Sequence, residues 1–235
     1  MIIKGLFIDI DDTILRFKED YDPNPASLFN VIRKAGQKFC NLDSNEIEIV
    51  IEQIKEQKKW WCWGDFIKAL KLDEKFFWEF AYKMEKQYLE ACETNLGKSL
   101  LLLKQTGIKL FITSNNPNKG IKHKLSLAEI PEVLQNELFS DFFGATEMEN
   151  MKWETNYWEK TICLSGIDAK NLAVIGDSFQ DDYVTPQKAG VAKTFLIDKN
   201  SKYANSKYSQ LQSVSGIAEI ASEFSRAKCS VLPVA

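Results

Sequence analysis

The sequence predicts an α/β protein built on a Rossmann-like parallel sheet with helices on both faces. Three short runs of large apolar residues support this class, namely residues 6–8, 108–112 and 172–175. Continuous apolar runs of this length are typical of strands that are buried on both faces of a parallel sheet. Between the first and second runs lies a long block of helical periodicity, which we predict to be an inserted, all-helical domain.

The inserted block contains three predicted helices. An Asn-Pro pair at residues 24–25 is typical of a helix start, and Gly36 can end that helix. Asp43 or Ser44 can cap the second helix. The third helix begins near Asp73 and carries one apolar stripe, made of Phe76, Phe77, Phe80, Ala81, Met84 and Tyr88.

Helices and strands are then expected to alternate to the end of the chain. The expected helices are residues 99–104, which Gly107 ends, 119–127, 157–164 and 217–224; a short strand precedes Gly144, and the last strand is residues 194–197. No strand is expected between residues 17 and 93.

Two domains follow from this pattern. The predicted α/β core comprises residues 1–16 and 95–235, and the helical domain comprises residues 17–94. Hinges between them are expected at residues 17–22 and near Glu93.

The composition of the chain indicates which partners and which cellular location to expect. The chain has 30 basic and 33 acidic residues and a net charge of −3, so we expect a small-molecule partner and no nucleic-acid surface. The apolar residues 2–10 are too few and too interrupted for a signal peptide or a membrane span, so we predict a cytoplasmic protein. We expect it to be a monomer or a homodimer. The five cysteines contain no CxxC pair, which argues against a disulfide framework or a zinc site.

The first strand runs directly into three carboxylates, Asp9, Asp11 and Asp12. At the carboxyl end of a strand, these acids would lie at the rim where open α/β sheets bind ligands. Because the acids repel one another, a divalent cation with oxygen ligands, such as Mg²⁺, is the simplest partner, although a solvated acidic turn has the same sequence. A helix-loop-helix calcium site fits badly, since Ile14 and Asp20 stand where that loop needs Gly and Glu.

Polar residues also follow the later strands. Thr113 ends the second apolar run, Lys152 lies in the polar segment after a short strand, and Asp177 follows the third run. Together with DxDxT at residues 9–13 and GDxxxxD at residues 176–182, this series resembles the four motifs of the haloacid dehalogenase (HAD) superfamily of phosphatases and phosphotransferases. The resemblance covers most of the chain outside the helical block and the tail.

The resemblance implies a role for each acid. Asp9 would be the nucleophile that forms an aspartyl-phosphate, and Asp11 would protonate the leaving group and then activate water. Mg²⁺ would be held by Asp9, by the backbone carbonyl of Asp11 and by Asp177, with support from Asp181 or Asp182. The acid at position 11 favours a phosphate ester over a carbon–halogen bond, because a halide leaves without a proton.

The resemblance also implies a phosphate cradle. Thr113 and Lys152 would bind the transferred phosphoryl group, and Ser114 and Asn115 would complete the cradle. Lys152 would in addition offset the charge of the acids. The proline that usually follows this lysine in the family is absent here, so Lys160 is the alternative.

The helical insertion resembles the C1 cap of the family, which closes over the site and selects the leaving group. The aromatic cluster at residues 60–66 is typical of core packing between helices, but it is also where we would place substrate contacts, with Trp63 among them.

The sequence thus predicts an Mg²⁺-dependent, HAD-like phosphatase that hydrolyses small-molecule phosphomonoesters. A phosphomutase or another phosphotransferase would use the same four motifs. A haloacid dehalogenase and a non-catalytic phosphate-binding regulator are further alternatives, and Asp11 argues against both. A response-regulator receiver ranks last, because its phosphorylated Asp follows a later strand and it has no helical insertion.

Overall fold

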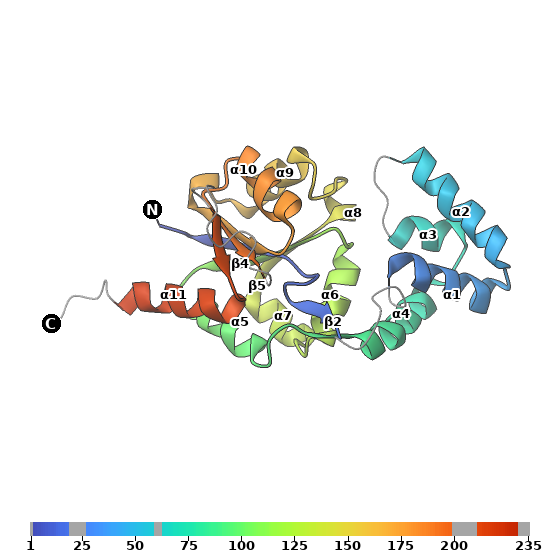
Figure 1. Ribbon diagram of the computed structural model, residues 1–235, viewed down its shortest axis with the longest axis horizontal. Coiled ribbons are helices and arrows are strands. Elements are labelled where there is room, and N and C mark those ends of the chain that lie inside the picture. The colour runs from blue at the N-terminus through green and yellow to red at the C-terminus, as the bar shows by residue number, and fades with distance from the viewer. Residues whose placement is uncertain (1, 19–26, 59–62, 199–210, 230–235) are drawn as a thin grey trace. The chain divides into compact units, whose positions relative to one another are not determined.

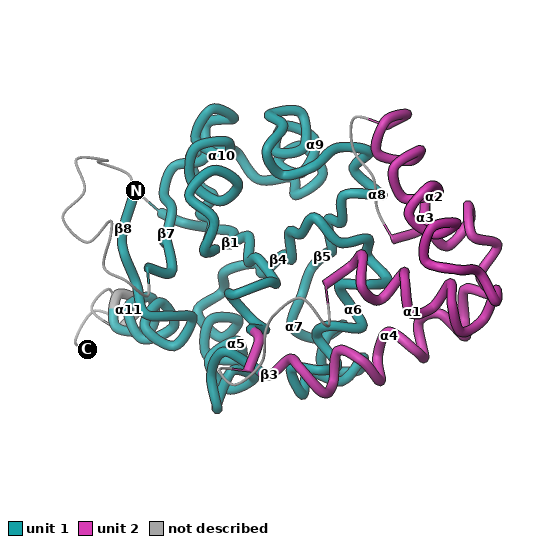
Figure 2. Tube along the Cα trace, turned by 45° about the vertical axis from the view of Figure 1, so that its right-hand side comes forward, with its two compact units in different colours: residues 1–16, 91–235 teal, residues 17–90 magenta. Residues whose placement is uncertain are grey.

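The computed structural model describes residues 2–18, 27–58, 63–198 and 211–229. Figure 2 shows the chain divided into two compact units, unit 1 of residues 1–16 and 91–235 and unit 2 of residues 17–90. Unit 1 resumes at residue 91, whereas the sequence analysis expects the core to resume at residue 95.

Unit 1 is built on a six-stranded sheet in the order β5-β4-β1-β6-β7-β8, and each neighbouring pair is parallel (Figure 1). Strands β1 and β6 are buried along their whole length, as their continuous apolar sequences predict. The predicted Rossmann-like sheet is therefore confirmed. Its strands are β1 (Gly5–Ile8), β4 (Lys109–Ser114), β5 (Phe139–Gly144), β6 (Leu172–Gly176), β7 (Lys193–Ile197) and β8 (Leu211–Val214).

Helices cover both faces of this sheet, with α9 and α10 on one face and α5, α7 and α11 on the other (Figures 1 and 2). Gly107 follows α5 at a φ of 91°, a left-handed conformation that glycine adopts without strain. Among the described residues, no helix has both the length and the apolar character needed to cross a membrane. The helices and turns of unit 1 are α5 (Leu96–Gln105), α6 (Asn118–Leu127), α7 (Glu132–Leu138), α8 (Ala145–Met148), α9 (Thr155–Ser165), η2 (Ala169–Asn171), η3 (Phe179–Val184), α10 (Thr185–Lys188) and α11 (Ile217–Cys229).

Three short strands were not predicted from the sequence. Strands β2 (Leu15–Phe17) and β3 (Leu89–Ala91) pair with each other, so the expectation of no strand between residues 17 and 93 is wrong. Each has three residues, too few for a period of two to show in the sequence. Strand β8 follows the strand that was expected to be last, and it lacks an apolar run because most of its residues are only partly buried.

Helices make up most of the described part of unit 2, and they pack around one apolar cluster. Asp43 caps α2 in a capping box, because its side chain accepts the N–H of Glu46 while the Glu46 side chain accepts the N–H of Asp43. The helix start expected at residues 24–25 lies outside the described residues, as does most of the hinge expected at residues 17–22. The helices are α1 (Leu28–Cys40), α2 (Ser44–Gln57), α3 (Trp63–Ala69) and α4 (Glu74–Tyr88).

Two local predictions for unit 2 are wrong. Gly36 does not end α1 but lies inside it, where a Cβ atom would come within 2.9 Å of Ile47 Cδ1, so the glycine lets α1 and α2 approach closely. Phe76 is 58% exposed and does not belong to the buried stripe of α4.

One buried tyrosine in unit 1 ties together the strands that lead to the site. Tyr157 on α9 is fully buried and packs against Trp158. Its hydroxyl donates a hydrogen bond to the carbonyl of Phe143 on β5 and accepts one, 3.1 Å long, from the N–H of Ser114 on β4. These bonds fix the carboxyl ends of β4 and β5 relative to each other.

We predict that Tyr157→Phe lowers the free energy of unfolding by about 1–3 kcal/mol. The phenyl ring keeps the packing of the tyrosine, but the buried N–H of Ser114 loses its acceptor. Urea denaturation of the wild type and the variant measures the difference. Identical midpoints and slopes would show that the hydroxyl does not stabilise the sheet.

Candidate active site

The side chains of the site come from the carboxyl ends of three adjacent strands. Asp9 directly follows β1, Thr113 lies at the end of β4, and Asp177 directly follows β6. Strand β1 pairs with β4 on one side and with β6 on the other. The three residues therefore share the edge at which open α/β sheets bind ligands.

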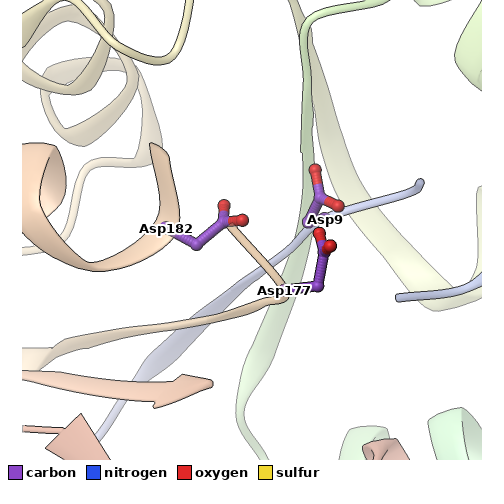
Figure 3. A group of neighbouring side chains, drawn as sticks. All are labelled: Asp9, Asp177 and Asp182. Carbon is purple, nitrogen blue, oxygen red and sulfur yellow. The ribbon is translucent and has the colours of Figure 1, made fainter. Parts of the chain in front are cut away.

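Three carboxylates cluster at this edge, those of Asp9, Asp177 and Asp182 (Figure 3). One oxygen atom of each lies within 4.8 Å of the others. Asp182 comes from η3, a π-helical turn, and it packs so tightly on Gly176 that a Cβ atom there would lie 2.2 Å from the carboxylate carbon. Asp9 and Asp182 are buried whereas Asp177 is exposed, so the cluster is accessible from the side of Asp177. Such a group of hard oxygen ligands can hold a divalent metal ion.

Lys152 provides a positive charge at the cluster. Its side chain is 2% exposed, and its ammonium group pairs with Asp9 and, at 2.6 Å, with Asp182. Burial disfavours the charged form, but the two carboxylates overcome this effect and raise the pKa of Lys152 well above its ordinary value. The lysine is therefore a permanent cation.

The three acids are harder to ionise than ordinary aspartates. Burial, followed by the charge of Asp182, raises the pKa of Asp9 to about 7 even though Lys152 opposes the shift. Burial and the charge of Asp9 likewise raise the pKa of Asp177 to about 7. Burial raises the pKa of Asp182 to about 6, again against Lys152. Burial is thus the largest cause of all three shifts, and the charge of Lys152 does not offset it.

Asp11 lies apart from this cluster. Its side chain is 54% exposed, and it is not one of the three clustered carboxylates. One oxygen pairs with the ammonium of Lys124, and the other accepts a hydrogen bond of 2.8 Å from the Asn116 side chain. Loss of water around the carboxylate is outweighed by these two partners, which hold the pKa of Asp11 below its ordinary value.

The sequence analysis missed Lys124 and Asn116. Lys124 lies on α6 between Ile121 and Leu125, and all three side chains are buried. The sequence could have indicated Lys124, since this lysine lies on the apolar stripe of a helix. A lysine buried at such a position needs a nearby acid to pair with its ammonium group. Asn116 lies in the polar segment that follows β4 and carried no such signal.

The predicted phosphate cradle lies at the end of β4. The hydroxyl of Thr113 is fully buried and has no hydrogen-bond partner among the described residues. The Ser114 hydroxyl accepts hydrogen bonds from the backbone and the side chain of Asn116, at 3.1 and 2.9 Å. Asn115 accepts the N–H of Lys152 at 2.8 Å and donates to Asp181 at 2.9 Å. Asn115 therefore links the segments that carry the lysine and the last acids.

For the last acid and for the lysine, the sequence left two candidates each, and the structure places only one of each pair at the cluster. Asp182 faces the cluster, whereas Asp181 binds Asn115. Lys152 reaches the cluster, whereas Lys160 binds the carbonyl of Met148 at 2.9 Å.

Trp63 belongs to unit 2 rather than to this edge of the sheet. It is 5% exposed and packs on Phe77 and Trp78, with ring centroids 5.6 and 5.5 Å away. This burial favours the core-packing interpretation of Trp63, while residues 60–62 of the aromatic cluster lie outside the described residues.

The model of a family described as haloacid dehalogenase-like hydrolases matches residues 8–196, which include Asp9, Lys152 and Asp182. Because this span is most of the chain, the protein belongs to that family of HAD-superfamily hydrolases. No curated protein matches the chain.

Solved structures of similar fold bear the names of different kinds of enzyme. A HAD phosphatase from Thermococcus onnurineus has a TM-score of 0.64 and 22% identity, over 94% of this chain and 97% of that one. A putative beta-phosphoglucomutase from Thermotoga maritima has a TM-score of 0.57 and 12% identity, over 98% and 100%. An L-2-haloacid dehalogenase has a TM-score of 0.60 and 13% identity, over 96% and 100%. These similarities show a shared fold, which does not by itself define the reaction.

We predict that Mg²⁺ raises the unfolding temperature of the protein, and that it does so more strongly above pH 7 than below pH 6. The pKa values of about 7 for Asp9 and Asp177 mean that the metal must displace protons at low pH. Without metal, the folded state binds more protons than the unfolded chain between about pH 4 and pH 7, so the contribution of these acids to stability falls as the pH rises through that range.

Thermal unfolding with and without Mg²⁺ across this pH range tests the prediction. Asp177→Asn should abolish most of the Mg²⁺ effect, whereas Asp168→Asn, at a side chain that is 72% exposed, should keep it. An equal Mg²⁺ effect in Asp177→Asn would exclude the cluster as the binding site.

Proposed function

We propose that this HAD-superfamily hydrolase is an Mg²⁺-dependent phosphatase that hydrolyses small-molecule phosphomonoesters through an aspartyl-phosphate on Asp9. The observation that carries the proposal is the different setting of two acids that are two residues apart. Asp9 is buried in the carboxylate cluster against Lys152, whereas Asp11 is half exposed outside the cluster and is held by Lys124 and Asn116. A nucleophile and a proton-transfer group need this division of roles.

Asp9 and Asp11 have different tasks in the proposed reaction. An oxygen of Asp9 attacks phosphorus while the bond to the leaving oxygen breaks. Asp11 gives a proton to that oxygen, and because Lys124 and Asn116 favour its ionised form, it must first take up this proton. Asp11 then takes a proton from a water molecule as this water attacks phosphorus and the bond to Asp9 breaks. The second step restores Asp9 and releases phosphate.

The proposed metal fits the residues that surround the nucleophile. Asp9, Asp177 and Asp182 would hold Mg²⁺, since one oxygen atom of each lies close to those of the others and carboxylate oxygens are ligands that this ion prefers. When bound, the ion would neutralise charge on the phosphoryl group and keep the acids ionised.

Lys152 and Thr113 are the proposed phosphoryl ligands. Lys152 is a buried cation beside the nucleophile, which suits it to bind a phosphoryl oxygen. Phe111 on β4 packs against Phe7 on the neighbouring strand β1. Because side chains alternate along a strand, Thr113, two residues after Phe111, lies on the same face of the sheet as these two rings. The buried hydroxyl of Thr113, which has no partner among the described residues, supports the same role.

We also propose that unit 2 is the cap that selects the leaving group. Its described helices have their own apolar cluster, which includes Ile47, Phe66 and Phe77, so the unit has a core separate from that of the sheet. A helical cap of this size suits small phosphate esters better than phosphoproteins.

Two rival reactions would use part of the same site. A phosphomutase would move phosphate between the carbons of a sugar and release little free phosphate. A dehalogenase would not need Asp11, because a halide leaves without a proton.

We predict that the protein releases phosphate from p-nitrophenyl phosphate in the presence of Mg²⁺ and not in the presence of a chelator. Asp9→Asn should reduce this activity by about 10⁴-fold or more, because removal of a nucleophile leaves only binding and electrostatic contributions. Asp168→Asn, at an exposed position in unit 1, is the matched control and should retain activity. Phosphate release is measured with the purified full chain.

Retained activity in Asp9→Asn would exclude Asp9 as the nucleophile. Halide release from a 2-haloacid, or transfer of phosphate within a sugar phosphate without free phosphate, would instead support the corresponding rival.

A further inference from the structure

The pair formed by Lys124 and Asp11 is not explained by the roles assigned above. Lys124 is 8% exposed and lies on the buried face of α6 beside Leu125. Burial of an ammonium group is costly unless an acid compensates it, so a lysine at this position needs a reason beyond helix packing. Its ammonium group pairs with Asp11, which is separated from it by more than a hundred residues in the chain.

The Asp11 carboxylate is held at both of its oxygens. Lys124 binds one oxygen, and the side-chain amide of Asn116 binds the other at 2.8 Å. Asn116 is held in turn, because its amide and its backbone N–H both donate to the Ser114 hydroxyl at the end of β4. Two contacts at different oxygens fix the rotation of a carboxylate, which a single contact does not.

Asp11 depends on such partners more than Asp9 and Asp182 do. Asp9 and Asp182 are fixed by burial and by Lys152, whereas the side chain of Asp11 is 54% exposed. An exposed aspartate samples several rotamers, and proton transfer requires a geometry within hydrogen-bond reach of the reacting oxygen. The rigid helix α6 and the end of β4 supply the missing constraint.

We propose that Lys124 is a positioning residue, which together with Asn116 holds the Asp11 carboxyl group in the orientation used for proton transfer. This inference rests on the proposed phosphatase function. Lys124 transfers no proton itself. The proton passes from Asp11 to the leaving oxygen as the bond between that oxygen and phosphorus breaks, and later from water to Asp11.

The test compares two substrates of similar size that differ in leaving group. Phenyl phosphate has a poor leaving group that needs a proton, whereas p-nitrophenyl phosphate has a better one that needs it less. We expect Lys124→Met to lower kcat for phenyl phosphate by about tenfold or more, to lower it less for p-nitrophenyl phosphate, and to change KM little. Lys124→Arg should restore most of the loss, because it keeps the charge and the donors.

Two further variants separate positioning from charge and from folding. Lys122→Met removes the same charge from an exposed position on the same helix and should behave like the wild type. In an Asp11→Asn background, Lys124→Met should cause no additional loss, since the two residues act as one unit. If Lys124→Met does not fold, as judged by thermal unfolding, Lys124→Gln replaces it in the same comparisons.

The outcomes are distinct. An equal loss of kcat for both substrates, or a full additional loss in the Asp11→Asn background, would overturn the positioning role while leaving the phosphatase function intact. A wild type that releases phosphate from neither substrate would overturn the proposed function, and this inference with it.

Discussion

The ion pairs of one buried ammonium group hold the site together. Lys152 lies against Asp9 and Asp182 with almost no exposure to water, and breaking a buried pair of this kind typically costs about 3–5 kcal/mol. The surrounding chain holds the lysine in place, because Asn115 accepts its N–H and the Trp158 indole donates to its carbonyl at 2.8 Å. Asp9, Asp182 and the segment that follows β4 are thereby fixed around the same cation.

The same arrangement explains why the site should attract a second positive charge. Lys152 lies beside several carboxylates, and burial, together with the repulsion between these acids, raises the pKa values of Asp9, Asp177 and Asp182. A metal ion would relieve this repulsion and allow the acids to remain ionised. Asp11 is not part of this cluster and pairs with Lys124, so each of the two lysines binds a different set of acids.

Much of the fold and of the site was predictable from the sequence, and the exceptions have physical causes. Asp9, Thr113 and Asp177 were found because each stands at the end of an apolar strand, and strand ends meet at one edge of a parallel sheet. Asp181 and Asp182 are adjacent in sequence, and only the π-helical turn decides which one faces the cluster. Lys124 was missed because it acts across the fold, and the strands β2 and β3 are too short to show a period.

The central claim is that Asp9 carries the phosphoryl group during turnover. The most direct measurement is to mix the protein with p-nitrophenyl phosphate and Mg²⁺, quench in acid within a turnover, and analyse the digested peptides by mass spectrometry. We predict that the peptide containing Asp9 gains one phosphoryl group, which hydroxylamine removes. The corresponding peptide of Asp9→Asn should carry no phosphoryl group. Phosphate release with the phosphoryl group on another residue would contradict this claim. Asp11→Asn is a second test, because the phosphorylated intermediate should break down slowly in this variant, and phosphate release without any labelled peptide in Asp11→Asn would also contradict the claim.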